Sequence, residues 1–348
     1  MIYGKILGIE TSCDETGASI VESNGQTLRV VSNALSTSIK LHVKTGGIIP
    51  ESAAREQLKY IIPVLKEALK TTKITNPAKQ IDAIAVTVGP GLIGSLLVGV
   101  ETAKTLSYIW KIPIIPVNHL YGHIFANFIG EMSNVKSQIS KDIRFPAIAL
   151  VVSGGHTDLV LMKNFNDLEW IGGTRDDAAG ECLDKVGRLL GLPYPAGAEI
   201  EKLAEIGNPK RFIFPSPLID SKDFDFSFSG LKTAVLRVVE AIEQLNNQTI
   251  QDISASVQNA VIKVLVKKTL KAAKEFNARS ILLGGGVAAN NSLRENFKFQ
   301  ISNFKLDTKL FVPDKKLCTD NAAMIAAAGF FAKESSWKAI DASPSLHF

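Results

Sequence analysis

The sequence is poor in the features that mark several protein classes. Its 348 residues include three cysteines with no Cys-x-x-Cys pair, which excludes a disulfide framework and favours a reducing compartment. The longest apolar run, residues 322–332, is about half the length that a bilayer requires. The first five residues lead directly into an apolar strand-like run. We therefore expect no signal peptide, no membrane span and a cytoplasmic protein.

Positive charge is in small excess. Lys and Arg number 39 and Asp and Glu 34, so the net charge is +5, which permits a polyanionic partner without requiring one. Hydrophobic residues make up 46% and charged residues 21%, which excludes a disordered chain. At about 150 residues per domain, the length suggests two domains.

Strand-like and helical runs alternate along the chain, a pattern typical of an α/β fold. Strands are predicted at 5–11, 17–23, 81–88, 114–115, 147–152, 280–283 and 310–312. Helices are predicted at 51–70, 92–110, 119–128, 177–190, 196–206, 230–245, 250–276, 288–300 and 320–333. The polar segment 130–144 indicates a surface connection, which divides the chain into lobes at 1–133 and 134–348.

One pattern occurs twice. Residues 6–21 and residues 149–161 each comprise an apolar strand, a small polar turn and a second apolar strand. Each copy begins one of the predicted lobes. The repeat therefore predicts two lobes of one basic fold facing a central cleft, with the last helix packing back toward the N-terminal lobe.

Four small-residue turns at strand ends could place backbone N–H groups around a phosphate. They lie at 11–12, 89–91, 153–155 and 284–286, and none matches a dinucleotide-binding or P-loop motif. Each turn alone is more often an ordinary tight turn. Four of them in a duplicated α/β plan favour a nucleotide cleft.

His119 and His123 are spaced i,i+4, which places both imidazoles on one helix face within reach of one metal ion. Leu120 follows the first histidine, where a metalloprotease of the His-Glu-x-x-His type has its catalytic glutamate. A third ligand is needed, and Asp320 is a candidate. From the residues alone, a helix-capping role for Asp320 is favoured.

Other polar groups have two interpretations each. Asp14 and Glu15, in the first hairpin turn, could bind a cation or act as acid and base, or could be a solvated tip. The acids of 176–184 are expected to be a solvated helix face. A lysine stripe is also expected to be solvated, with contact to a polyanion as the minority alternative; it comprises Lys263, Lys267, Lys271 and Lys274. The sequence contains no convincing nucleophile triad.

Taken in order, the motifs resemble those of one family. The opening Gly-Ile-Glu-Thr-Ser-Cys-Asp-Glu-Thr at 8–16 is similar to that of the TsaD family, the tRNA N6-adenosine threonylcarbamoyltransferases, in its bacterial branch. The matching segments continue at 89–92, 118–123, 152–157, 176–184, 226–233, 285–290 and 318–321. The resemblance therefore covers nearly the whole chain.

The resemblance implies a two-lobed actin/Hsp70/sugar-kinase-like fold and a metal, Fe(II) with Zn(II) as the alternative, one per subunit. The implied metal ligands are His119, His123 and Asp320, which reverses the interpretation of Asp320 from the residues alone. The implied substrate-binding residues are Val151, Val152, Ser153, Gly154, Gly155, Asp184, Gly197 and Asn290. We add a nucleotide cradle of Thr11, Ser12, Gly285 and Gly286. The family usually has two glycines after Tyr194-Pro195, whereas this chain has Ala196 and Gly197.

The implied reaction transfers a threonylcarbamoyl group from threonylcarbamoyl-AMP to N6 of the adenosine just 3′ of a tRNA anticodon. This needs no enzyme nucleophile, and Asp14 or Glu15 could take the N6 proton. The implied partners are tRNA, a dimerising paralogue of the same fold (TsaB-like), a small P-loop ATPase (TsaE-like) and the synthase that makes threonylcarbamoyl-AMP. The alternatives are an ATPase or sugar kinase of the same fold, a metalloprotease, and a non-catalytic subunit of the same pathway.

Overall fold

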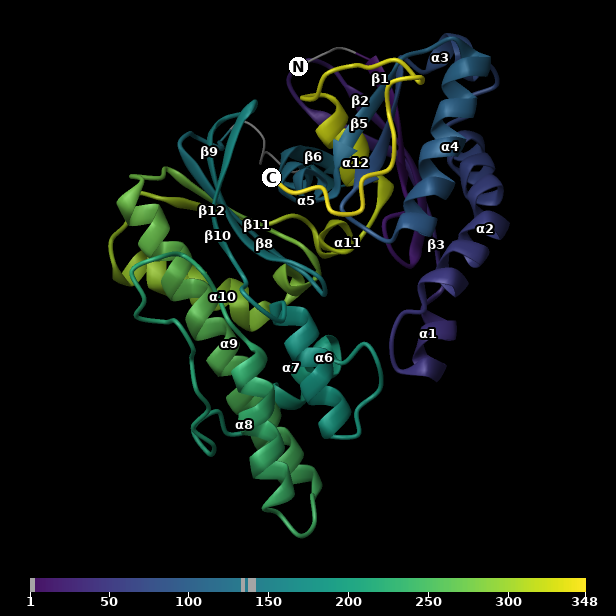
Figure 1. The fold of residues 1–348 in the computed structure, drawn as a ribbon. Helices are drawn as coiled ribbons and strands as arrows, with labels where there is room; N and C mark the ends of the chain where they lie inside the picture. Colours follow the sequence, from purple (N-terminus) through teal and green to yellow (C-terminus); the bar gives the residue numbers. More distant parts are fainter. Residues whose placement is uncertain (1–3, 133–134, 137–141) are drawn as a thin grey trace. The chain divides into compact units, whose positions relative to one another are not determined.

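The computed structural model describes residues 4–132, 135–136 and 142–348. The chain forms two compact units (Figure 1): unit 1 comprises Met1–Ile143 with Lys316–Phe348, and unit 2 comprises Arg144–Lys315. The sequence-based division assigns residues 316–348 to the second lobe, whereas the structure groups them with the first. Part of the polar connection expected at 130–144 lies outside the described residues.

Unit 1 is built on a sheet with the strand order β5-β4-β1-β2-β3-β6-β7. The strands are β1 (Gly4–Glu10), β2 (Glu15–Ser23), β3 (Leu28–Thr37), β4 (Ala83–Gly89), β5 (Ile114–Asn118), β6 (Ile129–Met132) and β7 (Val135–Lys136). The central strands β1, β2 and β3 run antiparallel, with Ile9 opposite Ala18, and β4 and β5 add to β1 in parallel.

The two faces of this sheet are covered by different helices because side chains alternate along a strand. Leu7 and Ile9 belong to a buried cluster with apolar residues of α2 (Pro50–Thr71) and α4 (Ile93–Trp110). Gly8 points the other way, against α12 (Ala322–Gly329). The further helical segments are α1 (Ile39–Thr45), α3 (Pro77–Gln80), α5 (His119–Phe125), a 3-10 turn (Ala126–Phe128) and α11 (Lys315–Cys318).

Unit 2 repeats the core of unit 1. Its sheet has the order β10-β9-β8-β11-β12, which corresponds to β3-β2-β1-β4-β5 in unit 1, with the same antiparallel and parallel pairings. The strands are β8 (Ala147–Val152), β9 (Thr157–Asn164), β10 (Asp167–Gly173), β11 (Ser280–Gly284) and β12 (Lys309–Phe311). The helices are α6 (Ala179–Leu189), α7 (Gly197–Ile206), α8 (Ser229–Glu240), α9 (Asn247–Glu275), a 3-10 turn (Gly286–Ala289) and α10 (Asn291–Asn303).

The α/β class and the duplicated hairpin-led plan are therefore confirmed. Helix ends differ from the predictions where capping residues intervene. Helix α10 begins at Asn291 rather than 288, because Asn290 caps it after a 3-10 turn. Helix α12 starts at Ala322, where the Asn321 side chain accepts from the N–H of Met324. Strands β3 and β10 were not predicted.

Candidate metal centre

Two histidines on one short helix form the first part of the site. Helix α5 follows β5 directly, and the side chain of Asn118 accepts a hydrogen bond from the N–H of Leu120 at 2.8 Å, which caps the helix. His119 and His123 are one turn apart on α5, with ring centroids 4.7 Å apart. Both side chains are buried. The i,i+4 spacing in the sequence thus does bring the two imidazoles together.

Asp320 belongs to the C-terminal segment of the chain, which is part of unit 1, and lies beside the two histidines. A Cβ on Gly8 would lie 2.2 Å from the carbonyl oxygen of Ala322, so only glycine lets α12 pack this closely on β1. The turn before α12 places Asp320 Oδ1 3.2 Å from Nε2 of His123 and 3.5 Å from Nε2 of His119.

The three side chains fit a metal ion. Their ligand atoms all lie within 4.8 Å of one another. Two donors that each lie about 2.1 Å from a tetrahedral ion are about 3.4 Å apart, close to the two His–Asp distances. Among the described residues, neither ring nitrogen of the fully buried His123 forms a hydrogen bond of good geometry, although Nε2 lies 3.2 Å from Asp320 Oδ1. A buried ring nitrogen that is poorly satisfied is costly, and coordination of a cation shared with Asp320 would satisfy it.

Glu10 supports His119 from behind, and the sequence interpretation missed this residue. Its Oε2 lies 3.2 Å from His119 Nδ1, and Thr87 Oγ1 donates to the same oxygen at 2.5 Å. The buried Glu10 is the last residue of strand β1 and follows the buried apolar run of residues 6–9. A carboxylate ending such a strand was the available signal. A carboxylate on one ring nitrogen orients the other nitrogen toward a metal.

The charges of these groups are mutually dependent. Burial alone would raise the pKa of Glu10, but the charge and hydrogen bond of His119 lower it overall. Burial alone would lower the pKa of His119, yet Asp320 and Glu10 together raise it to about 9. Two carboxylates thus favour positive charge at this position, whether it is a proton on His119 or a bound cation.

The first hairpin turn carries the acids proposed for proton transfer. Gln57 on α2 is buried and donates to the carbonyl oxygens of Thr11, Cys13 and Glu15 at 3.0–3.3 Å, which fixes the turn. Burial, followed by the negative charges of Asp320 and Asp14, raises the pKa of Glu15 well above its usual range. Burial also raises the pKa of the Cys13 thiol, so this cysteine is not an activated nucleophile.

The proposed cradle residues Thr11 and Ser12 lie beside this cluster. The Ser12 N–H donates to Glu10 Oε1 at 2.5 Å, and its hydroxyl lies 3.2 Å from His119 Nδ1. The Ser12 N–H is therefore already hydrogen-bonded within unit 1. The other half of the proposed cradle, Gly285 and Gly286, belongs to unit 2.

In unit 2 the structure brings several of the predicted substrate residues together. Val151 and Val152 are buried at the end of β8, and the following turn is closed by the Ser153 N–H, which donates to His156 O at 2.8 Å. Gly285 has a φ of +90°, and a Cβ there would lie 2.3 Å from Val152 O. The space around Gly154, Gly155 and Gly286 is open, as a site for a ligand requires.

Two polar side chains accompany these turns. Asp184 on α6 accepts from the N–H of Ala196 at 2.7 Å, next to Gly197, and its burial raises the pKa of its carboxyl group. Asn290 accepts from the N–H of Leu293 at 2.9 Å and donates to Gln258 Oε1 at 2.7 Å. These hydrogen bonds hold both side chains in fixed orientations.

Fold and site together define an α/β protein of two repeated units, with a His-His-Asp cluster in unit 1 that could hold a metal ion. A comparison with known proteins identifies the family. The profile described as tRNA N6-adenosine threonylcarbamoyltransferase (TsaD) matches residues 29–327. The chain belongs to this family.

Relatives of the same name match along nearly their full length. The one from Thermosipho africanus is 48% identical over 344 residues, which cover 98% of this chain and 99% of the relative. The one from Bacillus subtilis is 48% identical over 330 residues, which cover 94% and 90%. These matches agree with the profile.

Two solved structures of HypF share the fold. One holds phosphate and nucleotide and has a TM-score of 0.59 at 13% identity, covering 94% of this chain and 46% of that one. The T. kodakarensis HypF has a TM-score of 0.60 at 15% identity and the same coverage of this chain. This chain spans about half the length of each HypF chain. At these identities the likeness concerns the fold alone.

Proposed function

We propose that this chain transfers the threonylcarbamoyl group of threonylcarbamoyl-AMP to N6 of the adenosine 3′ of a tRNA anticodon, with release of AMP. The observation that carries the proposal is family membership over residues 29–327, joined to the His119, His123 and Asp320 cluster. A carbamoyl–phosphate anhydride is already activated, so the protein has to orient the two substrates rather than supply a nucleophile.

Unit 2 would hold the donor. The open turn Ser153–Gly155 and Gly286 leave room for phosphate and adenosine close to the backbone, and Asp184 and Asn290 offer fixed polar groups beside them. Val151, Val152, Gly197 and Gly285 shape the backbone around these groups. Adenylate binding to this unit is the first step that the proposal requires.

Unit 1 would hold the metal, which we propose is Fe(II), with Zn(II) as the alternative, because two imidazoles and one carboxylate suit either ion. When bound, the ion supplies Lewis-acid polarisation of a substrate oxygen. Glu10 holds His119 in the orientation that presents Nε2 to Asp320. We assign removal of the N6 proton to Asp14 or Glu15, which lie in the adjoining turn.

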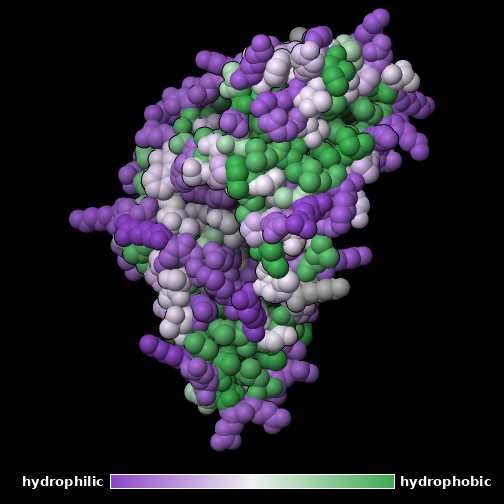
Figure 2. Space-filling model, turned by 45° about the vertical axis from the view of Figure 1, so that its right-hand side comes forward, coloured by the Kyte–Doolittle hydropathy of each residue, from purple (hydrophilic) through white to green (hydrophobic). Residues whose placement is uncertain are grey.

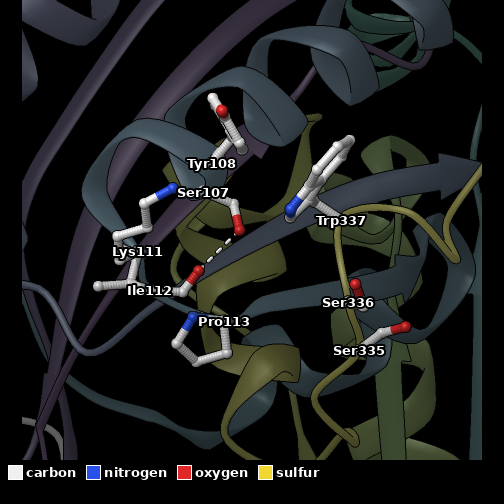
Figure 3. Close-up of a pocket in the computed structure, with 8 residues that line it drawn as sticks. All are labelled: Ser107, Tyr108, Lys111, Ile112, Pro113, Ser335, Ser336 and Trp337. Atoms are coloured by element: carbon white, nitrogen blue, oxygen red, sulfur yellow. Dashed lines mark hydrogen bonds between the residues drawn. The ribbon is translucent and has the colours of Figure 1, made fainter.

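We also propose that helper proteins bind to unit 1. Unit 1 exposes apolar side chains on α2 and α4: Leu58, Tyr60, Ile62, Ile93, Leu97, Tyr108 and Ile109. Figure 2, which turns the side of α2 and α4 forward, shows hydrophobic side chains gathered there. At the end of α4, Tyr108 meets Trp337 edge to face around a hollow of about 240 Å³ (Figure 3).

An exposed apolar surface of this kind favours a protein partner. We propose the dimerising paralogue there, with the small ATPase joining the complex. The net charge of +5 is small for a protein that holds a whole tRNA unaided. Transfer is therefore expected to depend on these helpers and to take place in the cytoplasm. Among the described residues, none of the helices combines the length and hydrophobicity needed to cross a membrane.

The test is a reconstitution from purified components. The chain is mixed with threonylcarbamoyl-AMP and unmodified tRNA transcript, with and without the helpers, and the modified nucleoside is measured by mass spectrometry. We expect multiple turnovers only with the helpers. A transcript whose target adenosine is replaced by guanosine is the control. Absence of product with every component present would overturn the proposed function, and multiple turnovers by the chain alone would overturn the dependence on helpers.

A further inference from the structure

A groove on unit 2 lies outside the sites described so far. It has a volume of about 610 Å³ and is lined by residues of α9, α10 and the segment that follows α10. Four lysines of α9 line it: Lys263, Lys267, Lys271 and Lys274. At 1.5 Å per residue, this row of cations extends over about 16 Å. No carboxylate is among the residues that line the groove.

The structure divides the four lysines into two kinds. Lys267 Nζ lies 2.6 Å from Asp220 Oδ1, and Lys271 donates to the carbonyl oxygens of Ser221 and Lys222, so both hold a neighbouring loop. Within the described part of the chain, the exposed Lys263 and Lys274 form no ion pair. These two cations, one near each end of the row, remain able to bind an anion.

The other lining groups indicate what kind of anion fits. Phe304 is 62% exposed, so its ring is accessible to a base that stacks on it. Asn259, Asn296 and Gln300 offer amides, which both donate and accept hydrogen bonds. Single-stranded RNA is bound by three kinds of group. A row of cations contacts its phosphates, an aromatic ring stacks on a base, and amides bind the base edges.

An acidic amphipathic peptide fits less well. Such a peptide would need an apolar floor for its hydrophobic face. Val266 and Leu270, the apolar α9 residues in the groove, are only 5% and 6% exposed. The groove therefore offers a row of cations and several amides, with Phe304 and Leu306 as its more exposed apolar groups.

We infer that this groove binds unpaired nucleotides of the RNA substrate, with phosphates at Lys263 and Lys274 and a base stacked on Phe304. The inference rests on the proposed function, because a tRNA substrate supplies such nucleotides. It assigns RNA contact to two lysines of the stripe and a structural role to the other two.

The test measures RNA binding rather than catalysis. Fluorescence anisotropy with an unstructured oligoribonucleotide and with a tRNA transcript is repeated at several salt concentrations. The variant K263Q/K274Q keeps most of the side-chain length. It should weaken binding about tenfold and reduce the slope of log affinity against log salt by about 1.4, the value for two lost single-strand phosphate contacts. F304L should weaken binding at least about fivefold with the slope unchanged.

The control is K210Q/K298Q, which removes the same charge from exposed lysines that do not line the groove. Equal affinities and slopes for the two double variants would overturn the inference. So would lysine-dependent binding of a glutamate-rich amphipathic peptide without any effect on RNA. If K263Q/K274Q loses RNA affinity while the wild-type chain makes no modified nucleoside, the groove stands and the proposed function fails. If transfer proceeds and the groove variants bind RNA normally, the reverse holds.

Discussion

Glu10 Oε2 lies 3.2 Å from Nδ1 of His119, and the other nitrogen of that ring faces Asp320. A strand of the sheet and a helix of the same unit thus determine together how one imidazole is turned. The carboxylate accepts from Nδ1–H, so Nε2 is left with the lone pair that a metal ion needs. This relationship makes Glu10 a positioning residue for the metal centre.

Glu10→Gln should weaken metal binding about 10- to 100-fold without unfolding the protein. The new amide can donate to Nδ1, which would place the ring proton on Nε2 and block the metal. Affinity is measured by competition with a chromophoric chelator. Glu22→Gln is the matched control, because Glu22 lies on the neighbouring strand and pairs with Arg29 at the surface. Equal metal affinity of the two variants would contradict the positioning role.

Removal of one metal ligand should remove the ion and abolish transfer. His123→Ala, His119→Ala and Asp320→Ala are each expected to have less than a tenth of the metal content of the wild-type chain by elemental analysis. Circular dichroism should show the fold retained. His347→Ala, near the chain end, is the control. Full metal content in the double variant of both site histidines would overturn the assignment.

Metal should also stabilise the folded state. At a free metal concentration 100 times its dissociation constant, binding adds about 2.7 kcal/mol. The thermal midpoint should therefore fall when a chelator removes the ion and return when metal is restored. His123→Ala should show no such response. A midpoint that chelator and added metal leave unchanged in the wild-type chain would contradict the site.

The two neighbouring glycines after β11 should respond differently to alanine. Gly285→Ala combines a left-handed φ with a Cβ that would lie 2.3 Å from Val152 O, so it should destabilise the protein by more than about 1 kcal/mol. The space around Gly286 is open, so Gly286→Ala should fold normally and weaken AMP binding. Calorimetry measures both effects. Gly230→Ala is the control, and unchanged AMP affinity in Gly286→Ala would remove this turn from the adenylate site.

Asp176 should contribute a pH-dependent part of the stability. Burial alone raises the pKa of its carboxyl group, but hydrogen bonds from Ser227, Phe228 and Ser229 outweigh burial and lower it below 3.8. The stabilisation is therefore present above pH 4 and is lost as the pH falls through the lowered pKa. Asp176→Asn should cost up to about 1 kcal/mol at pH 7 and less at pH 3. Denaturant titrations at both pH values check this, with Asp167→Asn as the control, and an equal loss at both would contradict it.

The apolar face of α2 should be needed for helper binding. Leu58 is 65% exposed and Ile62 is 50% exposed, and they are one helical turn apart. Leu58→Asp with Ile62→Asp should reduce the affinity for the paralogue by at least about tenfold, since burying each carboxylate in an interface is costly. Exposed Lys59→Asp, on the same helix, serves as a comparison. Ultracentrifugation that shows an intact complex in the double variant would move the docking surface elsewhere.

Elements with a strong periodic pattern could be predicted from the sequence, and elements defined by their neighbours could not. The apolar run of β4 and the long helix α9 were predicted nearly to their ends. Strand β3 has few consecutive apolar residues, because buried and more exposed side chains alternate along it. Its strand conformation depends on pairing with β2. Helix α12 starts at Ala322 rather than 320 because Asn321 caps it.

The site shows the same division. The spacing of His119 and His123 is local, so the sequence alone predicts that they share a face. Asp320 joins them only because α12 packs on Gly8, a tertiary contact that no local pattern shows, and the residues alone favoured a capping role for it. Only the family resemblance implied that Asp320 is a metal ligand. Glu10 was missed because its role depends on the orientation of a ring more than a hundred positions along the chain.

The three candidate metal ligands are synthesised at different times. His119 and His123 lie in the first half of the chain and Asp320 near its end, with all of unit 2 between them. A ribosome therefore completes unit 2 before the third ligand exists, and a nascent chain has no complete metal site however well its first lobe has folded. Metal loading at this cluster would thus require synthesis to have passed α12 and that helix to have docked on β1.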